Sequence, residues 1–155
     1  MPPLRSGPPV PQPPALPVTF RPTATRVVLL SVGALAFAVI TWIAVTLDSL
    51  NPGERTSFVF TAALFLGVLV LLSRPRVSAD ASGVTVVNLT SRRRLEWAEI
   101  IRVNLRPGDP WVYLDLSDGT SLPAMGIQPG MARQRAIADA RALRGLVEER
   151  GTERA

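Results

Sequence analysis

The class of this protein is decided by an uncharged apolar stretch, VVLLSVGALAFAVITWIAVTL, at residues 27–47. Its 21 residues would form about 30 Å of α-helix, which matches the hydrocarbon thickness of a bilayer. A second apolar run, FVFTAALFLGVLVLL, follows at residues 58–72. With its uncharged neighbours this run covers residues 56–73, near the lower length limit for crossing a bilayer. The sequence therefore predicts two transmembrane helices.

The connection between the two runs, residues 48–55, is short and polar. Its Asn51, Pro52 and Gly53 are typical of a turn, so the helices are expected to return antiparallel as a hairpin. Small residues also recur at a spacing of four in both runs, which predicts close packing of the two helix backbones. These residues are Ala34, Ala38, Ala63 and Gly67.

Arginines flank the hairpin asymmetrically. Arg21 and Arg26 precede the first run, and Arg74 and Arg76 follow the second. The loop carries only Arg55, beside two acidic residues. Because positive residues favour the cytoplasmic side, we expect a multi-pass protein of the cell membrane with both termini in the cytoplasm.

Residues 1–26 hold nine of the fifteen prolines, and no regular structure is expected there. The prediction is a disordered, proline-rich cytoplasmic tail. We interpret it as a solvated leader, and the alternative is a polyproline ligand for an aromatic groove on a partner.

The chain contains neither cysteine nor histidine. This absence excludes disulfides, thiolate nucleophiles, the usual zinc ligand sets and every catalytic triad with an imidazole base. The candidate acid–base residues beyond the hairpin are Glu96, Glu99, Asp109, Asp115 and Asp118. Asp109, Asp118 and Glu99 have structural explanations in turns and a strand junction, whereas Asp115 has none and lies on the solvent side of its predicted strand. No pair of these carboxylates suggests acid–base catalysis. We therefore expect no enzyme activity, no cofactor, no metal site and no small-molecule substrate.

After residue 76 the hydrophobic pattern changes to a period of two. This alternation predicts half-buried strands, and turn signals at residues 80–83 and at Asp118 with Gly119 predict an antiparallel meander. The inward-facing residues are predicted to be Val84, Val86, Leu95, Trp97, Ile101, Val103, Leu105, Val112, Leu114 and Leu116.

An amphipathic helix is predicted over residues 131–150, with Ile137, Ala140, Leu143 and Val147 on one stripe. Gly151 is expected to end this helix, which leaves residues 151–155 as a tail. The fold class is thus a membrane α-hairpin followed by an α+β domain. In that domain an antiparallel β sheet or incomplete barrel is capped by a C-terminal helix.

Several short motifs in residues 74–150 occur together in a recognisable order. They are Arg74-Pro75, the turn from Asp80 to Val84, Arg92 to Arg94 before Leu95, Trp97-Ala98-Glu99-Ile100, Asp118-Gly119 and the closing helix. With these motifs, residues 74–150 resemble the bacterial PH-domain family, in particular its actinobacterial branch named after a low-molecular-weight protein antigen. The resemblance implies a PH-like fold, a preceding membrane hairpin and no catalytic site.

A basic edge is expected where the strands return to the membrane. The first strand starts beside the bilayer, so the ends of the following hairpins should reach the same level. One hypothesis is that this edge docks on anionic lipid headgroups, with its aromatic residue at the interface. The alternative is that the arginines of this edge are only solvated and owe their position to the positive-inside preference. The possible lipid-headgroup contacts are Arg74, Arg76, Arg92, Arg93, Arg94, Arg106 and Trp111.

Two functions fit these features. The first is a non-enzymatic, membrane-anchored binding or scaffold module that contacts membrane lipids or an unidentified membrane or cytoplasmic protein. The alternative is a small accessory subunit of a larger membrane complex, acting through its hairpin. Nucleic acid is not expected, because no binding motif is present and Glu96 and Asp109 interrupt the positive surface.

Overall fold

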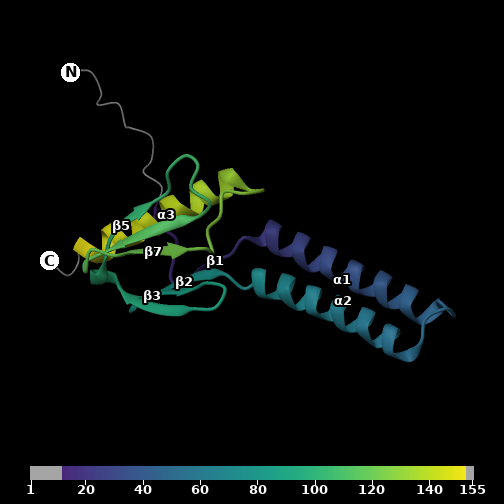
Figure 1. The fold of residues 1–155 in the computed structure, drawn as a ribbon. Coiled ribbons are helices and arrows are strands. Elements are labelled where there is room, and N and C mark those ends of the chain that lie inside the picture. The colour runs from purple at the N-terminus through teal and green to yellow at the C-terminus, as the bar shows by residue number, and fades with distance from the viewer. Residues whose placement is uncertain (1–11, 153–155) are drawn as a thin grey trace, which may run out of the picture.

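Two long helices project side by side from a small α+β domain (Figure 1). The computed structural model describes residues 12–152, so residues 1–11 of the predicted tail lie outside the described part. The elements are β1 (Val18–Phe20), α1 (Thr23–Thr46), α2 (Pro52–Leu72), β2 (Arg76–Asp80), β3 (Gly83–Val87), β4 (Arg92–Glu96), the short 3₁₀ helix η1 (Trp97–Glu99), β5 (Ile100–Asn104), β6 (Val112–Leu116), β7 (Ser121–Ala124) and α3 (Arg133–Thr152).

The turn of the hairpin is closed by side-chain caps. Asn51 accepts a hydrogen bond from the backbone N–H of Glu54 at 2.9 Å, and the Glu54 carboxylate accepts one from the Asn51 N–H at 2.9 Å. This capping box, with Pro52 at the first helical position, starts α2. Arg55 donates to the carbonyl of Leu47 at the end of α1, at 3.1 Å. The expected hairpin turn is therefore formed at residues 47–51.

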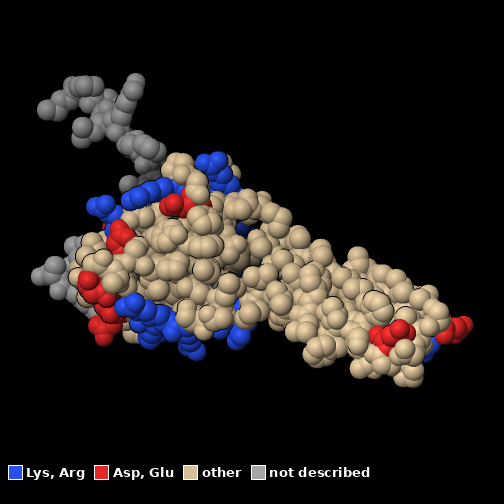
Figure 2. Space-filling model, in the orientation of Figure 1, with Lys and Arg blue, Asp and Glu red and all other residues tan. Residues whose placement is uncertain are grey.

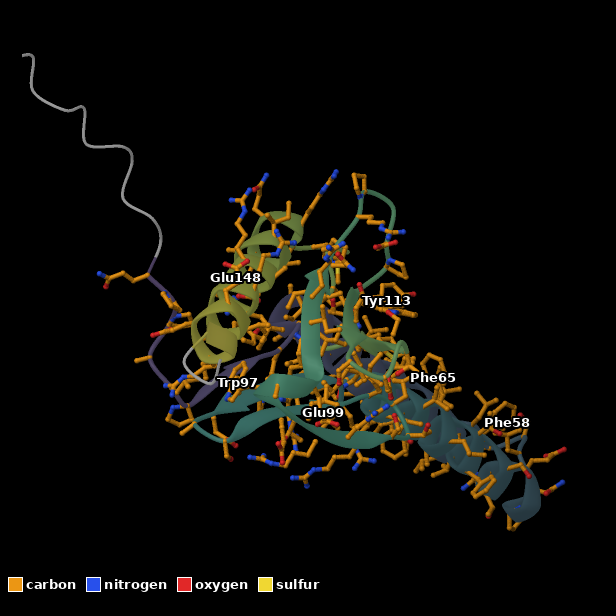
Figure 3. The ribbon with its side chains drawn as sticks, turned by 90° about the vertical axis from the view of Figure 1, so that its left-hand side faces the viewer. Phe58, Phe65, Trp97, Glu99, Tyr113 and Glu148 are labelled. Atoms are coloured by element: carbon orange, nitrogen blue, oxygen red, sulfur yellow. The ribbon has the colours of Figure 1, made fainter. Side chains whose placement is uncertain are left out.

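Both helices are long and apolar enough to cross a membrane, and only 11% of the most apolar stretch of each is buried. Their large apolar side chains mostly face outward, and Trp42 is 71% exposed. In Figure 2 the surface of the hairpin carries no charged residue between the domain and the loop at its tip. Phe58 and Phe65 are among these outward side chains (Figure 3).

The helices pack through different small residues from those predicted. Gly33 and Ala44 of α1 and Ala62 of α2 are buried, whereas Ala34, Ala38, Ala63 and Gly67 are all exposed. A Cβ at Gly33 would lie 3.0 Å from the terminal carbons of Leu66 and Leu69. The prediction was wrong because a spacing of four fixes a helix face, while the rotation of that face toward its neighbour depends on packing.

The domain contains two antiparallel sheets that do not close into a barrel. The first sheet has the order β1-β2-β3-β4 and the second has the order β5-β6-β7. Helix α3 packs on β5 and η1. This arrangement confirms the predicted fold class, an antiparallel meander with a C-terminal helix. The helix continues through Gly151 to Thr152, so the prediction that it ends at Gly151 is wrong.

Strand β1 was not predicted. Phe20 pairs with Val77, and Val18 pairs with Ala79, so residues 18–20 add an edge strand to the first sheet. The expectation of no regular structure before residue 27 is therefore wrong for β1 and for the first turn of α1. A strand of three residues is stabilised mainly by pairing with its neighbour, which no local pattern reports.

The core follows the predicted alternation except at one position. Trp97 is 1% exposed, and its indole N–H donates to the carbonyl of Asp80 at 3.1 Å. Trp97 is the first residue of η1, the 3₁₀ helix that packs on α3 (Figure 3). Ile101 was expected to face inward but is 64% exposed, because an irregularity in register between Ile100 and Arg102 turns its side chain outward.

Candidate functional site

Four arginines gather where the domain meets the hairpin. Arg21 follows β1, Arg26 lies in the first turns of α1, Arg74 follows α2, and Arg76 begins β2. They line one cavity of about 230 Å³ together with Leu30 and Val70. We call these four residues the hairpin-end arginine cluster.

The backbone brings this cluster together. Phe20 is paired with Val77, so Arg21 is placed next to Arg76 on the neighbouring strand. Gly126 packs against β2 at the same point, and a Cβ there would lie 2.6 Å from the Cα of Arg76. Only glycine permits this contact. The start of α1, the end of α2 and the segment after β7 thus meet around β2.

The charges of the cluster are uncompensated within residues 12–152. Neither of the two ion pairs in that part of the chain involves Arg21, Arg26, Arg74 or Arg76. The cavity is apolar on its hairpin side, where Leu30 and Val70 lie. Guanidinium groups bind phosphate oxygens in a bidentate way, so this cluster can hold a phosphate above an apolar floor.

Among the predicted lipid contacts, Arg92 lies nearest to Arg74 and Arg76 in the sheet. It pairs with Val87, which pairs with Arg76. Two strand spacings, about 10 Å, therefore separate Arg92 from Arg76. Its exposed side chain extends the positive surface of the cluster along the same end of the sheet.

Arg94 instead reaches toward the opposite end of the sheet. Its guanidinium donates to both carboxylate oxygens of Asp80, at 2.9 and 3.0 Å, to the hydroxyl of Thr85 at 3.0 Å, and to the hydroxyl of Ser82. The Arg94 hydrogen bond, with those from Ser82, holds the pKa of Asp80 well below its usual range. The same pairing raises the pKa of Arg94.

Arg93 points to the other face of β4, where its guanidinium lies 3.7 Å from the carboxylate of Asp118. The hydrogen bonds from Thr120, and then the charge of Arg93, lower the pKa of Asp118. The structure therefore does not bring Arg93 and Arg94 to one edge with the cluster, because alternation along the strand directs them to separate carboxylates. The lipid contact of these residues stays a prediction.

Arg106 and Trp111 lie away from the cluster. Arg106 is in the loop between β5 and β6, where it lines a different cavity against α3. Trp111 is half-buried, and its ring lies 6.5 Å from that of Tyr113 at a tilt of 50°. Tyr113 is on the second sheet (Figure 3). The seven predicted residues thus occupy at least three separate places.

The carboxylates have structural partners. Asp109 accepts from the N–H of Arg106 at 2.9 Å, and Glu99 accepts from the N–H of Glu96 at 2.6 Å. Asp115 accepts from the side chains of Asn104 and Ser121. Within residues 12–152 no group of three or more acidic residues could hold a metal ion.

Two members of the cluster were not predicted as ligand contacts. Arg21 and Arg26 entered the sequence analysis only as indicators of membrane orientation. Their position before the first apolar run mirrors that of Arg74 and Arg76 after the second. In an antiparallel hairpin both pairs must lie at one end, and this symmetry is the signal that could have identified the whole cluster.

Comparison with known proteins supports the fold. Residues 74–146 match the model of the Bacterial PH domain family. Uncharacterised proteins of Mycobacterium bovis and Mycobacterium tuberculosis are 35% identical to this chain over 81 residues, which is 52% of this chain and 52% of each relative. The chain thus spans about half the length of the curated relatives it matches, and no solved structure matches it. Residues 74–146 are therefore similar to the Bacterial PH domain family, and the two antiparallel sheets with the C-terminal helix are consistent with a PH-like fold.

Proposed function

We propose that this chain is a non-enzymatic, membrane-anchored binding module. In this proposal α1 and α2 cross the cell membrane, both termini face the cytoplasm, and the PH-like domain stands at the membrane surface. The outward-facing apolar side chains of the hairpin support this placement, because an apolar surface of that extent is not maintained in water. The similarity to mycobacterial proteins agrees with the actinobacterial branch predicted above, which stays a prediction.

The hairpin-end arginine cluster is the observation that carries a lipid-binding function. If the hairpin spans the membrane, the cluster lies at the depth of the headgroups. Each arginine near an anionic surface contributes about 1 kcal/mol of attraction. The cavity has guanidinium groups on the domain side and Leu30 and Val70 on the hairpin side, which suits a phosphate joined to an acyl chain.

The experiment measures which lipid the full chain retains. The protein is extracted from membranes of mixed phosphatidylcholine and phosphatidylglycerol, and its bound lipids are counted by native mass spectrometry. Wild type is expected to retain phosphatidylglycerol several-fold over phosphatidylcholine. Replacing Arg74 and Arg76 with glutamine should abolish that preference, since half of the cluster charge is lost.

Matched variants test whether the lipid preference depends on this site or on positive charge in general. Arg93→Gln with Arg94→Gln removes the same charge from residues that pair with carboxylates, and it should leave the lipid preference unchanged. Lysine at positions 74 and 76 keeps the charge that orients the hairpin but loses the bidentate geometry, and it should give an intermediate preference. Equal losses in both glutamine pairs would contradict the proposal.

The alternative, an accessory subunit of a membrane complex, has its own support. Ala63 and Gly67 are exposed on the outside of the hairpin, and nothing lies within 4 Å of a Cβ at Gly67. A partner helix could approach closely there. Ala63→Leu with Gly67→Leu should then remove a copurifying membrane protein while the hairpin stays folded. Unchanged copurification would favour the lipid-binding module.

A further inference from the structure

A second basic surface lies on the side of the domain, away from the hairpin-end arginine cluster. It is a groove of about 470 Å³ between α3 and the loop that joins β5 to β6. In Figure 1 this loop rises beside α3. The volume falls within the range of about 300–1,000 Å³ that is usual for ligand clefts. We call it the α3 groove.

The α3 groove has charged walls and an apolar floor. Its walls carry Arg106 from the loop and Arg133, Arg141 and Arg144 from α3. The floor includes the half-buried side chains of Leu105 and Ile137. Arg133, Ile137, Arg141 and Arg144 follow one another at spacings of four, four and three residues, so they share one face of the helix.

The positive charge of this groove is available to a ligand. Neither ion pair within residues 12–152 involves an arginine of the groove. Arg144 donates to the carbonyl of Val103 at 2.8 Å, which fixes its position and leaves its charge uncompensated. Asp109 is the acidic residue of the lining, and its carboxylate is already bound to the N–H of Arg106.

The direction of the groove decides the kind of ligand. Arg133 and Arg144 lie about 16 Å apart along the helix, and α3 runs away from the hairpin (Figure 1). A membrane at the hairpin end could contact only the beginning of such a row. No aromatic side chain lines the groove, which removes the base stacking that single-stranded nucleic acid requires.

We infer that the α3 groove binds an acidic segment of a partner protein, with carboxylates on the four arginines and an apolar side chain on Leu105 and Ile137. An extended acidic peptide matches the length of the arginine row and its charge. An apolar side chain in that peptide would cover the half-buried floor. This binding is independent of the lipid contact proposed above, and the two use different arginines.

The test selects peptides with the full chain in nanodiscs of neutral phosphatidylcholine, so that lipid charge plays no part. A random-peptide phage library is enriched on the wild type. The expected winners carry several Asp or Glu residues and at least one large apolar residue. A labelled winning peptide is then titrated by fluorescence anisotropy. Arg133→Ser and Arg141→Ser should each weaken binding about tenfold, as expected for the loss of a charge-assisted hydrogen bond.

Two comparisons keep the test specific. Arg102→Ser with Arg135→Ser removes two exposed arginines outside the groove and should change the affinity less than about twofold at physiological salt. Ile137→Ser should weaken the winning peptide but not a variant peptide whose apolar residue is serine. The proposal is overturned if no peptide is enriched, if the enriched peptides are not acidic, or if the control pair weakens binding as much as the groove variants.

Discussion

The hairpin and the domain place the same kinds of side chain in opposite environments. Trp42 on α1 is 71% exposed, whereas Trp97 in the domain is 1% exposed. The domain buries its apolar residues between two sheets and α3, and the hairpin buries small residues and turns its large apolar ones outward. The two regions thus expose opposite kinds of surface, and the same substitution should have opposite consequences in them.

The largest expected effect is on the domain side of this comparison. Trp97→Ala should destabilise the domain by about 3–5 kcal/mol, because it leaves a large cavity and removes the hydrogen bond to the carbonyl of Asp80. Trp42→Ala should leave the domain unchanged. Pulse proteolysis of the full chain in urea measures both. Similar losses for the two variants would show that the domain and the hairpin unfold as one unit.

Within the hairpin, glycine substitutions should sharpen the contrast between its inner and outer faces. Gly33→Leu forces a side chain against Leu66 and Leu69 and should destabilise helix pairing by about 1–3 kcal/mol. Gly67→Leu meets nothing within 4 Å and should be neutral. Spin labels at the exposed Leu35 and Leu64 report the distance between the helices. A broadened distance distribution is expected for the first variant alone.

These contrasts explain how much the sequence could predict. The length of the uncharged runs identified the hairpin, and the hydrophobic periodicity identified the meander and α3. Both signals are local properties of the sequence. They could not identify which small residues meet in the hairpin, since Gly33 and Ala34 differ only by a rotation of the helix. They also missed β1, whose three residues are ordered by their pairing with β2.

The candidate site was less predictable than the fold. The sequence grouped Arg92, Arg93 and Arg94 because they are adjacent, yet the strand sends neighbouring side chains to opposite faces. Arg94 pairs with Asp80, which is 14 positions away, and no local sequence pattern indicates this pairing. Uncompensated charge is therefore a property of the tertiary structure, although the order of the two apolar runs already places the four arginines of the cluster at one end of the hairpin.

The smallest expected effect concerns Asp80, the carboxylate that pairs with Arg94, and it tests whether this pairing stabilises the domain. Because the folded-state pKa of Asp80 is lowered, its contribution to stability is fully present above the unfolded pKa of about 3.9 and is lost as the pH falls through the folded pKa. Asp80→Asn keeps an oxygen for the N–H groups of Ser82 and Gly83 but loses the charge. At neutral pH its Tm should lie a few degrees below that of the wild type.

This difference in Tm should shrink as the pH is lowered from about 4, because the Asp80 carboxylate of the unfolded wild-type chain then takes up a proton, which stabilises the unfolded state, while the folded carboxylate is protonated only at lower pH. Thermal melts followed by circular dichroism across that range measure it.

Asp118→Asn is the matched control. Asparagine preserves the hydrogen bonds from Thr120, and Arg93 lies 3.7 Å away with no hydrogen bond between the two side chains, so its Tm should change less. A difference that persisted unchanged to low pH would mean that the Asp80 turn, and not its charge, stabilises this end of the domain.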